Sequence, residues 1–310
     1  MKRRFDIRKY TIVAIIVTVV MYVLSTFVFN RGSVSLGGVL AGLAFLAANA
    51  VVVYMTVDFF SVGINHAAPL IFATLALSFP AVAMYDASCW YALAINIAFY
   101  LSVRFYGGEI SSDMAFFYSA LLGVASLMFP PAIWLALFLL LMNFWLSADK
   151  ARFVVMSLAG FVLPLVVYLA VLFATGDIRD LMPAVSAYLG DTVTIYAGFG
   201  AASAARVIKV VTIIVCFVVA LVAFLRRSAE YSVSHSHAMI MVFAWAAAVT
   251  LLMLLFSNNN IVANTTLIMV PVSIVLYDYM VWGGSDRDCR IALAFVSLAV
   301  LLEYAFFAVK

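Results

Sequence analysis

The chain has 310 residues, of which 68% are hydrophobic and 10% charged, with a formal net charge of +3 and a mean hydropathy of +1.20. Soluble domains carry about 25% charged residues, so this composition excludes a water-soluble globular protein. The net charge is small and the basic residues are scattered, which argues against nucleic acid as a partner.

Lipid is therefore the expected solvent, and a lipid-exposed backbone must satisfy its own hydrogen bonds in helices or a closed barrel. The run from Tyr10 to Phe29 is apolar on every face, unlike the alternating pattern of barrel strands. It is also longer than the apolar region of a secretory signal, which has about 7 to 15 residues. We expect an all-α protein whose first span is retained.

Windows of about 20 apolar residues predict eleven membrane spans in one transmembrane domain, residues 1–310. In chain order the spans are 10–29, 36–57, 68–84, 87–105, two within 114–146, then 153–174, 207–225, 238–256, 265–282 and 291–309.

Residues 114–146 form two spans because Pro130 and Pro131 remove two backbone donors and break the helix. Each half is about 24 Å long at 1.5 Å per residue, less than the roughly 30 Å of hydrocarbon. Either the bilayer thins here or the pair is a re-entrant hairpin. Both alternatives keep the two flanking loops on one face.

Small residues and prolines mark other helices. Gly38 and Gly42 are four apart, a spacing that lets two helices approach closely in lipid. Gly160 and Pro164 predict a bend in the span 153–174, and Pro271 predicts a kink in the span 265–282.

Basic residues orient the spans, because Lys and Arg are retained on the cytoplasmic side. With the N-terminus inside, most of the 17 Lys and Arg fall in inner segments. The outer side keeps only Arg31, Arg179, Arg206, Lys209 and Lys310. The predicted topology is therefore N-terminus in and C-terminus out.

The interval 175–206 is the longest lapse in apolar character, and this topology places it on the outer face. Within it, apolar residues from Ile178 to Leu189 recur at helical spacing, and Asp177 occupies an N-cap position. We expect an amphipathic helix that lies in the outer membrane interface.

The three histidines, His66, His235 and His237, do not form a metal motif. His235 and His237 fall in the polar stretch RRSAEYSVSHSH, and no Cys or carboxylate cluster completes the four ligands of a zinc site. We expect no metal and no cofactor, and interpret both residues as members of a solvated loop.

Ionisable side chains inside a bilayer are costly and mark ion or proton pathways. Asp58, Asp278 and Glu303 each fall within a turn or two of the end of a span, where they can reach water. The sequence therefore disfavours a coupled transporter.

Sugar transfer from a lipid carrier would need an outer-face carboxylate and cationic or amide groups that hold phosphate. The predicted outer loops supply both kinds of group. The candidate catalytic residues are Asp86, Asp177 and Asp180, and the candidate ligand-binding residues are Arg31, Arg179, Arg206, Asn258 and Asn260. Loops between membrane helices are polar in any case, so a solvated surface is the plain alternative.

The segment from Pro130 to Asp177 resembles a family of short bacterial inner-membrane proteins catalogued only as a domain of unknown function. The resemblance is carried by LLLMNFWLSADKAR, LAGFVLPLVVYL and ATGDIRD. The later SNNNIVANTTLIMVPVSIVLYDYM is similar to the penultimate helix of that family. This resemblance implies a multi-pass bacterial membrane protein and supplies no activity.

The same segment more faintly resembles the membrane core of glycosyltransferases that use polyprenyl-phosphate sugars. Those enzymes carry an acidic residue in the first outer loop, whereas that loop here is FNRGSVSL, with Arg31 and no carboxylate. The nearest substitutes, Asp86 and Asp177, lie in other loops.

The leading functional expectation is an accessory or scaffold component of a cell-envelope process in the cytoplasmic membrane of a bacterium. Its partners would be the lipid bilayer and other membrane proteins. The alternative is a glycosyltransferase-like protein that binds a polyprenyl-phosphate-linked substrate on its outer face. Whether the chain is an enzyme is open.

Overall fold

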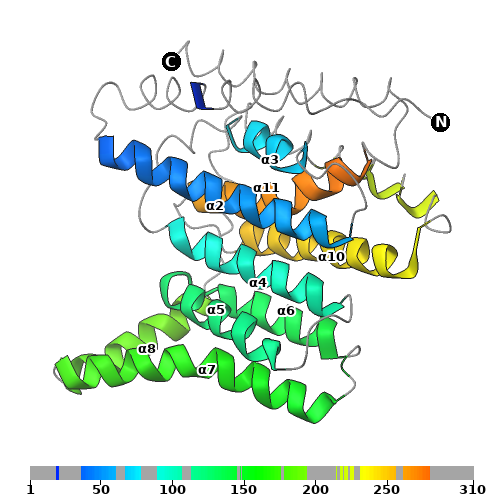
Figure 1. Ribbon diagram of the computed structural model, residues 1–310. Helices are drawn as coiled ribbons and strands as arrows, with labels where there is room; N and C mark the ends of the chain where they lie inside the picture. Colours follow the sequence, from blue (N-terminus) through cyan, green and yellow to red (C-terminus); the bar gives the residue numbers. More distant parts are fainter. Residues whose placement is uncertain are drawn as a thin grey trace, which may run out of the picture. The chain divides into compact units, whose positions relative to one another are not determined.

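A computed structural model describes the helical parts of the chain (Figure 1). The described residues are 19–20, 36–60, 67–77, 89–106, 113–144, 147, 149–175, 178–193, 214, 217–218, 220–222, 224–226, 231–255 and 261–279. Within these ranges every regular element is a helix, so the all-α prediction is confirmed for the described part.

Three of the helices found in these ranges are long and apolar enough to cross a membrane, namely Leu36–Phe59, Lys150–Thr175 and His235–Leu252. Shorter apolar helices cover Met114–Met128, Ala132–Phe144 and Thr266–Asp278. Helices of this length and composition indicate a membrane protein.

The chain divides into two compact units that interleave along the sequence. The first comprises residues 1–87, 199–243 and 268–310, and the second comprises 88–198 and 244–267. Helices α10 (Val233–Leu255) and α11 (Ile261–Asp278) each contribute to both units.

In the first unit, α2 (Leu36–Phe60) packs against α3 (Ala67–Leu77). Two buried polar side chains of α2 are satisfied by their own helix. The Asn49 side-chain amide donates to the Phe45 carbonyl at 2.9 Å, and the Thr56 hydroxyl donates to the Val52 carbonyl at 2.7 Å. Such back-bonding lets polar residues lie within an apolar helix.

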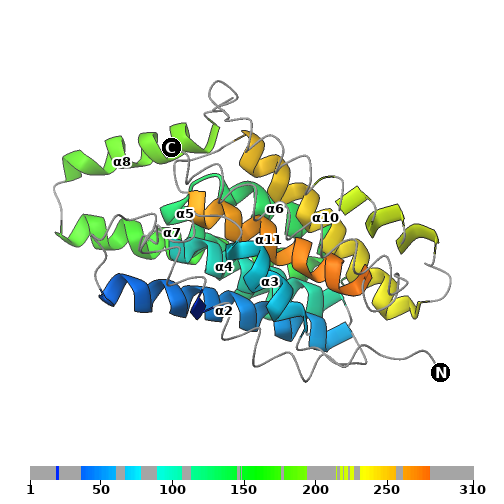
Figure 2. The same ribbon diagram turned by 90° about the horizontal axis from the view of Figure 1, so that it is seen from above.

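The second unit is built from five consecutive helices. They are α4 (Trp90–Tyr106), α5 (Met114–Met128), α6 (Ala132–Phe144), α7 (Lys150–Thr175) and α8 (Ile178–Val193). Helix α5 contacts α4, α6 and α7, and α8 follows α7 and contacts it (Figures 1 and 2). The stacked rings of Phe99 and Trp245, 5.3 Å apart, bring the second half of α10 into this unit.

The predicted break at the two prolines is confirmed. Helix α5 ends at Met128 and α6 begins at Ala132, and the connection closes through an Ala132 N–H to Phe129 carbonyl bond of 2.9 Å. The helices have 15 and 13 residues, so each is about 20 Å long, well short of the hydrocarbon thickness.

Two glycines allow α5 and α7 to approach closely. A Cβ added to Gly160 of α7 would collide with the backbone carbonyl of Phe116 on α5. A Cβ added to Gly123 of α5 would lie 2.5 Å from the Phe161 carbonyl oxygen and 3.1 Å from Pro164 Cγ. Gly160 and Pro164 therefore serve this contact, and α7 continues as a helix through Pro164.

The interpretation of His235 and His237 as members of a loop is wrong. The structure begins α10 at Val233, so His235 and His237 belong to a helix and not to a solvated loop. The reason is the cap: the Ser232 hydroxyl accepts the His235 backbone N–H at 3.2 Å, and the Ser232 carbonyl accepts that of Ser236 at 2.9 Å.

Candidate functional site

The predicted outer-face residues fall almost entirely outside the described part of the chain. Those outside it are Arg31, Asp86, Asp177, Arg206, Asn258 and Asn260. Arg179 and Asp180 lie in the first turn of α8, whose helical character agrees with the predicted interfacial helix, but their side chains are not described. The predicted phosphate-binding cluster therefore stays a prediction.

The structure instead brings together two ionisable side chains of the first unit. His235 lies in the first turn of α10, and Asp278 is the last residue of α11. His235 Nε2 lies 2.9 Å from Asp278 Oδ1, and the exposed fractions of the two side chains are 6% and 5%. The contact is at short range, and it is an ion pair when the imidazole is protonated.

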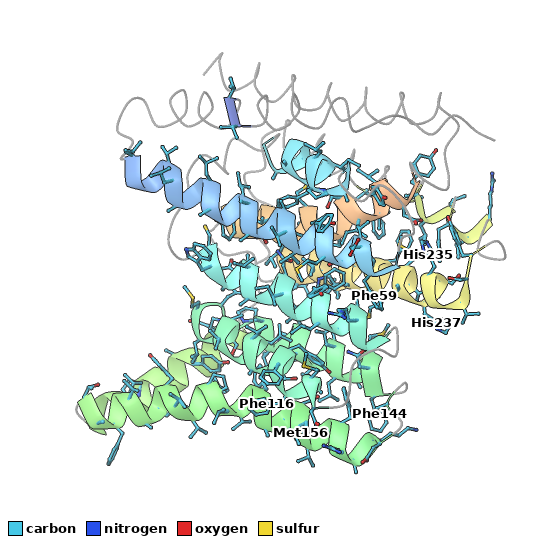
Figure 3. All side chains as sticks on the ribbon, in the orientation of Figure 1. Phe59, Phe116, Phe144, Met156, His235 and His237 are labelled. Carbon is cyan, nitrogen blue, oxygen red and sulfur yellow. The ribbon has the colours of Figure 1, made fainter. Side chains whose placement is uncertain are left out.

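Aromatic rings cover the pair. The Tyr231 ring is stacked on the His235 imidazole with centroids 4.6 Å apart, and the Phe224 ring is stacked on Tyr231 at 5.5 Å. In Figure 3, His235 lies close to the end of α11, whereas His237 lies further along α10 and is exposed. The two histidines of SHSH therefore have different environments.

Each partner is placed by its own helix terminus. The Ser232 cap fixes the first turn of α10 and with it the position of His235. Asp278 reaches the same level because α11 runs back from its short connection to α10. The contact with the carboxylate holds the imidazole ring in one orientation.

The pair ties the start of α10 to the end of α11. It supplies two ligand-type side chains, whereas a catalytic zinc site uses three protein ligands. We therefore regard it as a candidate for coupling between α10 and α11, and assign it no chemical step.

The expectation that Asp278 reaches water near the end of its span is wrong. Asp278 is buried where α10 places His235 beside it. A sequence signal for this pairing exists: His235 and Asp278 lie at similar distances from the short connection between two consecutive spans. Antiparallel neighbours place such positions side by side.

The second ion pair described belongs to the second unit and is exposed. Arg152 of α7 bonds Asp113, which precedes α5, at 2.6 Å, with about half of each side chain exposed. It joins the starts of α5 and α7 at one end of the unit.

Comparison with known proteins gives a family and nothing more specific. No curated protein matches the chain significantly, and no solved structure does. The family DUF6427, described as a family of unknown function, matches residues 5–310. Because this match covers almost the whole sequence, the chain belongs to the DUF6427 family.

Proposed function

We propose that the protein is a multi-pass protein of the bacterial inner membrane, with about eleven spans, its N-terminus inside and its C-terminus outside. Support comes from the three long apolar helices and from the distribution of basic residues. The Arg152–Asp113 bond adds to this, because it joins two ends that the topology assigns to the same inner face.

We infer that its role is that of an accessory or scaffold component of a cell-envelope process. The observation that carries this is the surface of α7. This 26-residue helix buries only Phe153, Ser157 and Gly160, all in its first half. Large apolar side chains are exposed along the whole helix, as Val155 at 63% and Phe173 at 62% illustrate.

The charged pairs of the described part point the same way. His235–Asp278 and Arg152–Asp113 each join two segments of the chain itself. Polar side chains therefore hold the protein's own helices together, and α7 offers an apolar face to its surroundings. An apolar face of this length suits lipid or another membrane helix.

Photo-crosslinking in living cells tests the proposal. A photoreactive amino acid is placed at Val166 or Phe173, which are exposed, and at Phe153, which is buried, as the control. We expect the same membrane protein to be captured from Val166 and from Phe173. It should not be captured from Phe153 or from samples that were not irradiated. Lipid adducts alone would contradict a scaffold role.

The same experiment addresses the glycosyltransferase-like alternative. Its candidate residues lie in loops of the predicted outer face, so a probe at Asp191, exposed on α8, is the relevant position. Capture of a polyprenyl-phosphate lipid at Asp191, with no protein captured from α7, would favour the glycosyltransferase-like function.

A further inference from the structure

Four buried polar side chains lie at corresponding ends of four helices in the second unit. Ser102 lies near the end of α4, Tyr118 near the start of α5, Asn143 at the end of α6, and Ser157 in the second turn of α7. Their exposed fractions are 0%, 1%, 0% and 3%. They form a polar cluster, which we call the four-helix cluster.

One direct hydrogen bond holds part of the cluster. The Asn143 side-chain amide donates to the Ser102 hydroxyl at 2.7 Å, which links α6 to α4. This bond uses Asn143 Nδ2 and leaves Oδ1, an acceptor only, for another partner.

The other three polar atoms lie near one another, and none of them makes a direct hydrogen bond of good geometry. The Tyr118 hydroxyl lies within interaction range of the Ser157 and Asn143 side chains. Even so, Tyr118 Oη, Asn143 Oδ1 and Ser157 Oγ each lack a direct hydrogen bond to any protein group described. Three such atoms in one buried place are unusual, because buried polar groups are nearly always paired.

The close approach of α5 and α7 brings these atoms together. Gly160 lies one turn beyond Ser157, and its lack of a side chain lets α7 lie against Phe116. Tyr118 is two residues beyond Phe116 on α5. The glycine contact therefore fixes the distance between the Tyr118 hydroxyl and Ser157.

The three atoms together ask for a partner that both donates and accepts. Asn143 Oδ1 only accepts, whereas the two hydroxyls can do either. A buried water typically makes about three hydrogen bonds to groups that the protein leaves unpaired. We propose that one water molecule binds between Tyr118, Asn143 and Ser157, and joins α5, α6 and α7.

In this arrangement the water donates to Asn143 Oδ1 and to one hydroxyl, and accepts from the other. Through the Asn143–Ser102 bond the network extends to α4. The four-helix cluster then links α4, α5, α6 and α7 through hydrogen bonds that include the water. This proposal is independent of the proposed membrane partner of α7.

The first test is whether Tyr118→Phe lowers or raises the thermal midpoint of unfolding. Tyr118→Phe removes a hydroxyl, and Tyr168→Phe on the exposed face of α7 is the matched control. A hydroxyl bonded to water is lost at a cost, so we expect Tyr118→Phe to lower the thermal midpoint of the full chain in detergent by about 2 °C or more. A midpoint that is unchanged or raised, relative to the control, would overturn the proposal.

The second test separates a water from a direct contact through tyrosine. Ser157→Ala and Asn143→Ala are made singly and together in the Tyr118→Phe background. A bridging water still joins Ser157 to Asn143 there, so the pair should lower the midpoint by less than the sum of the single shifts. Additive shifts would show that nothing bridges them and would refute the water.

Two controls keep the second test interpretable. Ser102→Ala removes only the bond to Asn143, and its shift is compared with that of Asn143→Ala. Ser126→Ala removes a buried hydroxyl that bonds the Gly123 carbonyl of its own helix at 2.7 Å. Ser126→Ala should show no coupling to Ser157→Ala beyond the measurement error, whereas Ser102→Ala acts through Asn143 and should couple more weakly than Asn143→Ala.

Discussion

At the scale of single residues, the histidine–aspartate pair carries the most consequence for stability. Both side chains are nearly inaccessible to solvent, and the aromatic stack of Tyr231 and Phe224 lies over the imidazole. A buried ion pair contributes little when intact, because desolvation offsets the attraction. Removing one partner is different, because it breaks the contact between α10 and α11 in a buried place.

Asp278→Ala should therefore lower the free energy of unfolding by about 3 kcal/mol, as breaking a buried pair does. Asp191→Ala, at an exposed position on α8, should change it by less than about 0.5 kcal/mol. The double variant His235→Ala/Asp278→Ala should cost less than the sum of the single changes. Unfolding titrations in detergent, followed by circular dichroism, measure Asp278→Ala, His235→Ala, the double variant and Asp191→Ala. Additive effects of the first two would show that the pair is not coupled.

The sequence could predict some of this site and not the rest, for reasons that differ by residue. The Ser232 cap is a local signal, and reading it would have begun α10 before His235. The burial of Asp278 is not local, because it depends on which side chain of α10 lies beside it. The unpaired atoms of Tyr118, Asn143 and Ser157 depend on three helices at once, and no spacing in the sequence reveals them.

At the scale of elements, helix boundaries followed from local chemistry. Two consecutive prolines cannot donate backbone hydrogen bonds, so the division between α5 and α6 was predictable to within a few residues. The partner of each helix was not predictable in this way. Gly160 and Pro164 suggested a bend in α7, whereas the structure shows that Gly160 provides room for α5.

The α5–α7 contact predicts that Gly→Ala substitutions at two positions change the free energy of unfolding in opposite directions. Alanine usually stabilises a helix relative to glycine, by about 0.5–1 kcal/mol. Gly37→Ala in α2 should show this gain, because nothing lies within 4 Å of its added Cβ. Gly160→Ala should instead lower the free energy of unfolding by about 1–3 kcal/mol, because the Phe116 backbone cannot yield easily. Equal effects at the two glycines, in the same unfolding assay, would contradict the close packing of α5 on α7.

At the scale of the whole molecule, this member of the DUF6427 family has helices that are long and apolar enough to cross a membrane. Two described charged pairs each join segments of the chain itself, and α7 presents apolar side chains outward. Span count and orientation are proposals that depend on the distribution of Lys and Arg, because apolar periodicity gives helices without giving them a direction. The side of the membrane on which α8 lies is therefore the central claim.

Accessibility of single cysteines tests that claim most directly. Cys89, Cys216 and Cys289 are replaced by serine, and a single cysteine is introduced by Asp191→Cys in α8 or by Lys150→Cys at the start of α7, both exposed positions. The account predicts that a membrane-impermeant maleimide labels Asp191→Cys on intact spheroplasts, and labels Lys150→Cys only after lysis. Labelling of both positions from the same side would contradict the topology and the outer location of α8.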